Sequence, residues 1–147
     1  MIILKYSPRF CVGIIGTRRR DTGKAYAKVE KAFNELPISV RKDCWIVSGG
    51  CPKGGDRFAE IIAKKYGLPI LIIYPDWDKY GKIAGLKRNT PVAEMSDFII
   101  ACVAKDRKGG TEDTIKKFIK KIKKDWEYPN VIDTWKKKAK KVLRIVK

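Results

Sequence analysis

The sequence contains no histidine. Histidine is the commonest general base near neutral pH and the usual partner of a nucleophilic serine or cysteine, so its absence excludes those catalytic pairs and most zinc sites. The four cysteines form no Cys-x-x-Cys motif and no other metal-binding spacing, which favours buried structural thiols. We therefore expect no bound metal and no required cofactor. Any acid–base chemistry would have to come from carboxylates.

Long apolar stretches are also absent. No apolar run reaches the roughly 18 residues that a membrane-spanning helix needs, so no membrane association is expected. The first ten residues lack the charged and apolar regions of a signal peptide, which favours a cytoplasmic protein. Glutamine is missing and lysine is abundant, a bias that resembles hyperthermophile proteins. The length predicts a single domain over residues 1–147.

Negative charge is scarce. The chain has 34 Lys and Arg against 16 Asp and Glu, a formal net charge of +18. The region from Lys116 to Lys147 carries thirteen of these basic residues against three acidic ones, a net +10. Such a field attracts nucleic acid or phosphorylated ligands, although lysine-rich solvated surfaces are also common. Residues 120–147 are expected to form a lysine-rich extension packed on the domain.

Short apolar runs alternate with helical patterns along the chain. The runs have the length of buried strands, and the apolar residues between them recur at helical spacing. This alternation predicts a three-layer, Rossmann-like, doubly wound α/β fold, with a mostly parallel sheet and helices on both faces. Strands are expected at 10–16, 44–50, 69–75 and 97–104, and helices at 25–36, 56–66, 115–126 and between 76 and 96, where Pro91 bears on where the helix begins.

The end of the chain shows weaker patterns. Residues 130–133 are a candidate short final strand. A closing amphipathic helix is expected after it, with an apolar stripe made by Trp135, Ala139, Val142, Leu143 and Val146.

Glycines gather at the carboxyl ends of the predicted strands. Ligands of doubly wound sheets bind at this edge, so Gly16, residues 48–50 and residues 74–75 should meet there. Glycine allows a phosphate to approach the backbone, and both SGGCPKGGD (48–56) and RKGGTEDT (107–114) lie beside a predicted helix start, where anions bind. A branched side chain at Gly50 should therefore abolish binding and hardly disturb the fold. The glycine turn GIIG (13–16) does not match G-x-G-x-x-G, and GGCPKGGD (49–56) lacks the Gly-Lys-Ser/Thr ending of a P-loop.

Five segments together resemble a known family. They are GTR (16–18), IVSGGCPKGGDRFAE (46–60), YPDWDKYGKIAGLKRN (74–89), MSDFIIA (95–101) and GGTEDTI (109–115). Their order and context resemble the YspA/YpsA-like branch of the SLOG superfamily. That superfamily also includes the LOG (lonely guy) cytokinin-activating enzymes and the DprA/Smf DNA-processing proteins. The resemblance covers about residues 10–118 and implies a Rossmann-like nucleotide-binding fold.

The resemblance also implies a ligand site. Gly16, Thr17 and Arg18 would border a phosphate or ribose, and Arg88 and Asn89 would reach in from a helix. The other implied binding residues are Ser48, Gly49, Gly50, Gly54, Gly55 and Asp56 around the ligand and at a helix N-terminus, Trp77 and Tyr74 as surfaces for a base, and Gly110 and Thr111 in the phosphate pocket.

Some of these residues have other interpretations. A carboxylate repels phosphate, so Asp56 is expected either to cap its helix or to contact a ribose. Trp77 could fill a loop, and Thr17 could cap a helix.

LOG-type catalysis is not expected. The LOG signature P-G-G-x-G-T-x-x-E carries the glutamate that serves N-glycosidic cleavage, and counting from Gly110 and Thr111 places Thr114 at that position. Glu112 is the remaining catalytic candidate. On a helix, however, Glu112 would point in a different direction from position 114, where the LOG glutamate would lie.

Three functions are open on this basis. The first is binding of a nucleotide or nucleotide-derived phosphorylated ligand, as a sensor or carrier. The alternatives are a nucleoside-monophosphate N-glycosidase, or a protein that binds nucleic acid without sequence specificity through its basic C-terminal region. The resemblance adds a homodimer as a candidate assembly.

Overall fold

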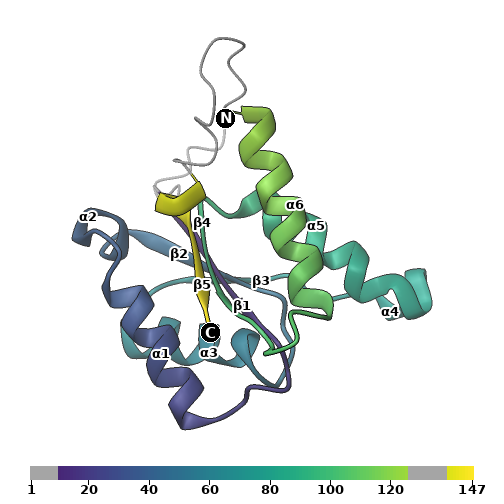
Figure 1. Cartoon of the computed structure of the whole chain (residues 1–147), viewed down its shortest axis with the longest axis horizontal. Coiled ribbons are helices and arrows are strands. Elements are labelled where there is room, and N and C mark those ends of the chain that lie inside the picture. The colour runs from purple at the N-terminus through teal and green to yellow at the C-terminus, as the bar shows by residue number, and fades with distance from the viewer. Residues whose placement is uncertain (1–9, 126–138) are drawn as a thin grey trace, which may run out of the picture.

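The computed structural model describes residues 10–125 and 139–147 (Figure 1). At its centre lies a five-stranded sheet in the order β3-β2-β1-β4-β5, and every neighbouring pair is parallel. The strands are β1 (Phe10–Gly16), β2 (Cys44–Ser48), β3 (Ile70–Ile72), β4 (Phe98–Cys102) and β5 (Leu143–Val146).

Helices cover both faces of the sheet, which confirms the predicted doubly wound α/β fold (Figure 1). The face of α1 and α3 buries Val29 and Phe58 in one apolar cluster. The opposite face, of α5 and α6, buries Val92 and Phe118 in a second cluster. The helical elements are α1 (Gly23–Asn34), α2 (Ile38–Arg41), α3 (Gly55–Lys65), α4 (Trp77–Tyr80), the 3-10 helix η1 (Gly81–Ile83), α5 (Ala84–Met95) and α6 (Gly110–Asp125).

The central strand β1 explains why a continuous apolar run is needed there. Successive side chains of a strand point to opposite faces, and both faces of this sheet are covered. Val12 and Ile14 accordingly enter the cluster under α1 and α3, whereas Cys11 and Ile15 enter the cluster under α5 and α6.

The end of the chain differs from the prediction. Leu143–Val146 forms β5 and pairs with β4, so the expected closing helix is wrong over these residues. Val142 and Val146 are buried in the structure, as the predicted helix also required. The apolar spacing of this segment fits a strand as well as a helix. The free edge of β4 decides in favour of the strand. Residues 139–142 are helical. The strand predicted at 130–133 lies outside the described residues.

Pro91 does not mark the start of a helix. It lies inside α5, which begins at Ala84. Proline removes one backbone hydrogen bond from a helix interior. The next two residues, Val92 and Ala93, are 2% and 1% exposed, so packing against the sheet holds the helix together at this point.

Among the helices of the described ranges, none is both long and apolar enough to cross a bilayer.

Candidate functional site

A cavity of about 690 Å³ lies at the carboxyl end of the sheet, beside the ends of β1 and β4. The chain leaves β1 towards α1 on one face and leaves β4 towards α6 on the other, so strand order reverses between these two neighbours. This is the position at which doubly wound sheets bind ligands. Twelve of the residues expected in the site line the cavity: Gly16, Thr17, Arg18, Gly49, Gly50, Asp56, Tyr74, Trp77, Arg88, Asn89, Gly110 and Thr111.

Ser48, Gly54 and Gly55 are not among the lining residues. Ser48 is fully buried, and its hydroxyl donates to the Asp56 carbonyl over 3.2 Å and accepts from the Gly50 N–H over 3.1 Å. Ser48 therefore holds the turn after β2 against the first turn of α3.

Gly54 and Gly55 let α3 approach β1. A Cβ at Gly55 would lie 2.1 Å from the Gly16 nitrogen, and one at Gly54 would lie 2.3 Å from the Thr17 carbonyl oxygen. The Gly54 N–H donates to Asp21 Oδ1 over 2.9 Å. These two glycines serve the packing of backbone on backbone, in which a side chain has no room.

Gly50 lines the cavity and its binding role stays a prediction, but the expected effect of its substitution on the fold needs correction. Its φ of +76° suits glycine, and a Cβ there would meet the Tyr74 ring at 2.5 Å. A branched residue at Gly50 would thus strain the backbone and collide with Tyr74, so the expectation of an undisturbed fold is wrong.

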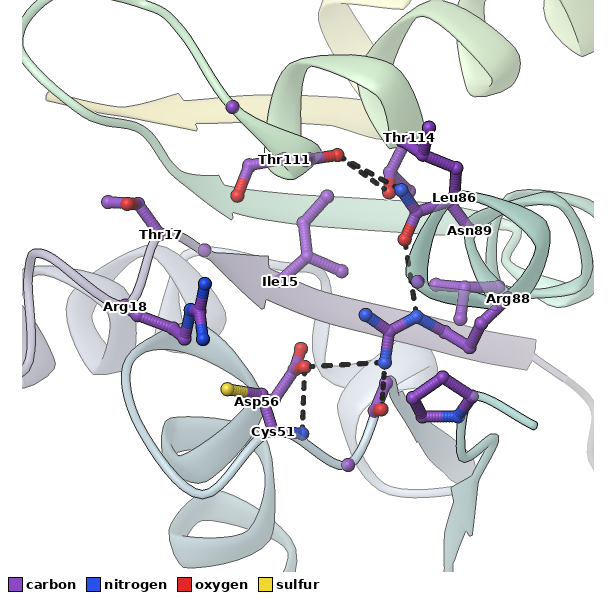
Figure 2. A pocket seen from close by; sticks show the side chains of 18 of the residues that line it. Ile15, Thr17, Arg18, Cys51, Asp56, Leu86, Arg88, Asn89, Thr111 and Thr114 are labelled. Carbon is purple, nitrogen blue, oxygen red and sulfur yellow. Dashed lines mark hydrogen bonds and ion pairs between the residues drawn. The ribbon is translucent and has the colours of Figure 1, made fainter. Parts of the chain in front are cut away.

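Asp56 and Arg88 form the floor of the cavity (Figure 2). Asp56 is 7% exposed, and its Oδ2 accepts the Cys51 N–H over 3.0 Å. The Arg88 Nη1 lies 3.8 Å from the same Oδ2 and donates to the Gly49 carbonyl. Burial raises the pKa of the Asp56 carboxyl, while the Cys51 N–H and the Arg88 charge oppose that rise.

Asp56 is not the cap of its helix. The N-cap of α3 is Gly54, which makes no side-chain bond, and Asp56 lies in the first turn. Its carboxylate stabilises the preceding loop instead, through the Cys51 N–H. Of the two expected roles, capping is wrong, and the ribose contact stays a prediction.

Asn89 connects α5 to the start of α6. It is 5% exposed, and its Nδ2 donates to the Gly110 carbonyl over 3.2 Å (Figure 2). The same Nδ2 donates to Asp113 Oδ2 over 3.0 Å. The pair Arg88 and Asn89 therefore joins the glycine loop after β2 to the N-terminus of α6. These contacts from α5 hold the turn of Gly109 and Gly110 in position.

The two candidate catalytic positions on α6 have different surroundings. Thr114 lines the cavity, and its hydroxyl donates to the Gly110 carbonyl over 3.4 Å. Glu112 is not a lining residue, and its carboxylate is paired with Arg107 at 2.5 Å. The position at which the resemblance to LOG enzymes would place a glutamate thus lines the cavity with a threonine.

Positive charge predominates around the cavity. Five basic residues line it, whereas Asp56 is the only carboxylate among the described lining residues. Arg19 is neutralised by Asp106 at 2.8 Å, which lowers the pKa of that carboxyl. The Arg18 guanidinium has no hydrogen bond or ion pair within residues 10–125 and 139–147. The basic lining residues are Arg18, Arg19, Lys82, Arg88 and Lys108.

Aromatic rings stand at the mouth of the cavity. Tyr74 and Trp77 are 65% and 59% exposed, so Trp77 does not fill a loop. Leu86 and Val92 add apolar surface from α5. Sequence reasoning did not include these last two residues, yet helical spacing could have found Val92, which lies one turn beyond Arg88.

Within the described ranges, no group of three or more Cys, Asp or Glu residues is placed to hold a metal ion. Comparison of this chain with protein-family models, curated proteins and solved structures finds no match.

Proposed function

We propose that this protein binds a nucleotide or a nucleotide-derived phosphorylated ligand, as a sensor or carrier. The observation that carries the proposal is the cavity at the strand reversal, whose described lining holds five basic residues and one carboxylate. Its volume of about 690 Å³ lies within the range of small-molecule sites.

The N-terminus of α6 is the proposed phosphate site. This helix has 16 residues, and its dipole and free amides favour an anion at Gly110 and Thr111. A Cβ at Gly110 would meet only Asn89 Nδ2, at 3.9 Å, so the backbone is open towards the cavity. Arg18 supplies a cation that no described side chain neutralises.

The rim at Tyr74 and Trp77 is the proposed site of the base. Two exposed rings beside an otherwise charged cavity offer faces for a planar group. Stacking on such rings is tolerant of the identity of the base.

Thr114 favours binding over N-glycosidic cleavage. A threonine hydroxyl is neither a carboxylate nucleophile nor a general base of suitable pKa, and here it is engaged with the Gly110 carbonyl. Glu112 is paired with Arg107 outside the lining. Glu112→Gln is therefore expected to leave ligand binding unchanged.

The nucleic-acid hypothesis receives less support from α6. Lys117 and Lys121 direct their amino groups to carbonyls of Leu86, Glu94 and Ser96 at 2.8 Å. These two lysines therefore stabilise the contact of α6 with α5. The remaining basic residues of the region from Lys116 to Lys147 include those at 126–138, outside the described ranges.

The test is native mass spectrometry of the freshly purified protein, followed by denaturation and identification of any released molecule. A retained nucleotide-sized mass is expected. Released nucleic-acid fragments of mixed length would contradict the proposal, as would a protein that retains nothing and binds no nucleotide at millimolar concentration.

Arg18→Ala should weaken binding of the identified ligand by about tenfold, since a hydrogen bond to a charged group is lost. Lys31→Ala is the matched control, because it removes one positive charge from an exposed α1 residue outside the cavity. Equal weakening in both variants would attribute binding to the overall charge of the protein, and not to the cavity.

A further inference from the structure

The Asp56 carboxylate is held by the protein through its Oδ2 atom, and the Gly49 N–H also stabilises its charged form. The Cys51 N–H and Arg88 Nη1 both meet Oδ2. Figure 2 shows the other oxygen, Oδ1, turned into the cavity. Asp56 is 7% exposed, so this oxygen belongs to the cavity wall and not to the outer surface.

A ligand that fills the cavity must satisfy Oδ1. It would displace the water that reaches this oxygen, and a buried acceptor left without a donor is costly. An ionised phosphate carries only acceptors and is repelled by the carboxylate. A hydroxyl can donate, and two adjacent hydroxyls can donate to the same carboxylate.

The contacts of neighbouring residues link Asp56 to the two other features of the cavity. Gly50 lies against the Tyr74 ring, and the adjoining Gly49 lies against Asp56 and Arg88. Arg88 is followed by Asn89, which bonds the Gly110 carbonyl at the start of α6. The aromatic rim, the Asp56 carboxylate and the N-terminus of α6 therefore all border one cavity, where a single ligand can reach all three.

We infer that Asp56 reads the ribose hydroxyls of the ligand and selects ribonucleoside 5′-phosphates over their 2′-deoxy counterparts. The base, the ribose and the 5′-phosphate of one ligand would then meet the rim, Asp56 and the α6 N-terminus of the same cavity. This inference rests on the proposed function and adds to it the class of sugar that the site accepts.

The test compares each of the four ribonucleoside 5′-monophosphates with its 2′-deoxy form by isothermal titration calorimetry on the full chain. For every base that binds, the ribonucleotide should bind about tenfold or more tightly, because the deoxy form leaves a buried charged acceptor short of a donor. In Asp56→Ala the ratio should fall to about threefold or less.

Asp21→Ala is the matched control for damage to the loop. Asp21 accepts the Gly54 N–H from outside the cavity lining, so its loss disturbs the same loop without touching the ligand. Absolute affinities should fall in this variant, but the ratio of ribose to deoxyribose forms should stay as in the wild type. If Asp56→Ala does not fold, Asp56→Asn keeps an acceptor for the Cys51 N–H and should lower the ratio to an intermediate value.

Equal affinity for ribo and deoxy forms in the wild type would overturn the inference and leave the proposed function standing. An undiminished ratio in both folded Asp56 variants would also overturn it. Binding of neither form of any base would contradict the proposed function itself, and the inference with it.

Discussion

The two glycine-rich segments that flank the cavity look alike in sequence but differ in what they face. In the segment after β2, a Cβ at Gly54 or Gly55 would collide with backbone of β1 or the turn after it. In the segment before α6, a Cβ at Gly109 meets nothing within 4 Å, and one at Gly110 meets only Asn89 at 3.9 Å. Protein atoms therefore fill the space beside Gly54 and Gly55, whereas the space beside Gly109 and Gly110 is open.

Glycine thus has two uses here that a sequence pattern cannot distinguish, the approach of a ligand and the approach of another part of the protein. A glycine allows close approach of any atoms to the backbone, whether they belong to a ligand or to the next strand. After β2 the approaching atoms are protein atoms, so those glycines serve the fold. Before α6 the approach is free, so that turn is the better candidate for an anion.

The largest effect is expected from Gly55→Ala. The added Cβ would lie 2.1 Å from the Gly16 nitrogen, and backbone atoms cannot move aside as the end of a side chain can. We expect a loss of about 3 kcal/mol or more in the free energy of unfolding, at the upper end for overpacked sites. Urea unfolding followed by circular dichroism measures it. An unchanged midpoint would show that α3 does not need this approach to β1.

Gly110→Ala should weaken ligand binding and leave the stability of the fold intact. The free energy of unfolding is expected to be unchanged or raised by about 0.5 kcal/mol. The reason is that alanine has fewer conformations than glycine in the unfolded chain, so less entropy is lost when the helix forms. Affinity for the ligand released from the native protein should fall at least about tenfold, because the methyl group occupies the space of an anion against the helix start. Titration calorimetry measures the affinity, and urea unfolding measures the stability.

Gly23→Ala is the control for this pair. Gly23 begins α1 as Gly110 begins α6, and a Cβ at Gly23 meets nothing within 4 Å. It lies outside the cavity lining, so its substitution should leave affinity unchanged. Normal binding by Gly110→Ala would remove the α6 N-terminus from the proposed site.

A smaller effect distinguishes two carboxylates beside the segment after β2. The Gly54 N–H, and next the Arg57 side chain, lower the pKa of Asp21 below its usual 3.8, whereas burial raises the pKa of Asp56 above it. The stability that Asp21 contributes is therefore present above pH 3.8 and is lost as the pH falls through its folded pKa. The contribution of Asp56 is present below pH 3.8 and is lost as the pH rises through its folded pKa.

Urea unfolding between about pH 3 and pH 7 tests these signs. Asp21→Asn should be less stable than the wild type at neutral pH, and this deficit should shrink on acidification. The free energy of unfolding of Asp56→Asn, relative to the wild type, should instead improve as the pH rises. The same pH trend in both variants would contradict the assignment of opposite shifts.

Much of the fold could be predicted from the sequence. β1 and β2 begin where the apolar runs begin, and α1, α3 and α6 lie within a few residues of their expected positions. Burial on both faces demands continuous apolar strands, and helices leave a 3.6-residue stripe, so both patterns are local. The strand-to-helix connections then place Gly16, Gly49 and Gly110 at one edge of the sheet.

The rest depended on contacts between distant parts of the chain. Alternating and helical spacing coincide in the short run around Leu143, and only the free edge of β4 makes it a strand. In the same way, the sequence determined that glycines would follow the strands, but the tertiary structure decided which of them meet Thr17, Tyr74 or an open cavity. The physical reason is that conformational freedom belongs to the residue, whereas its use depends on which atoms the fold brings against it.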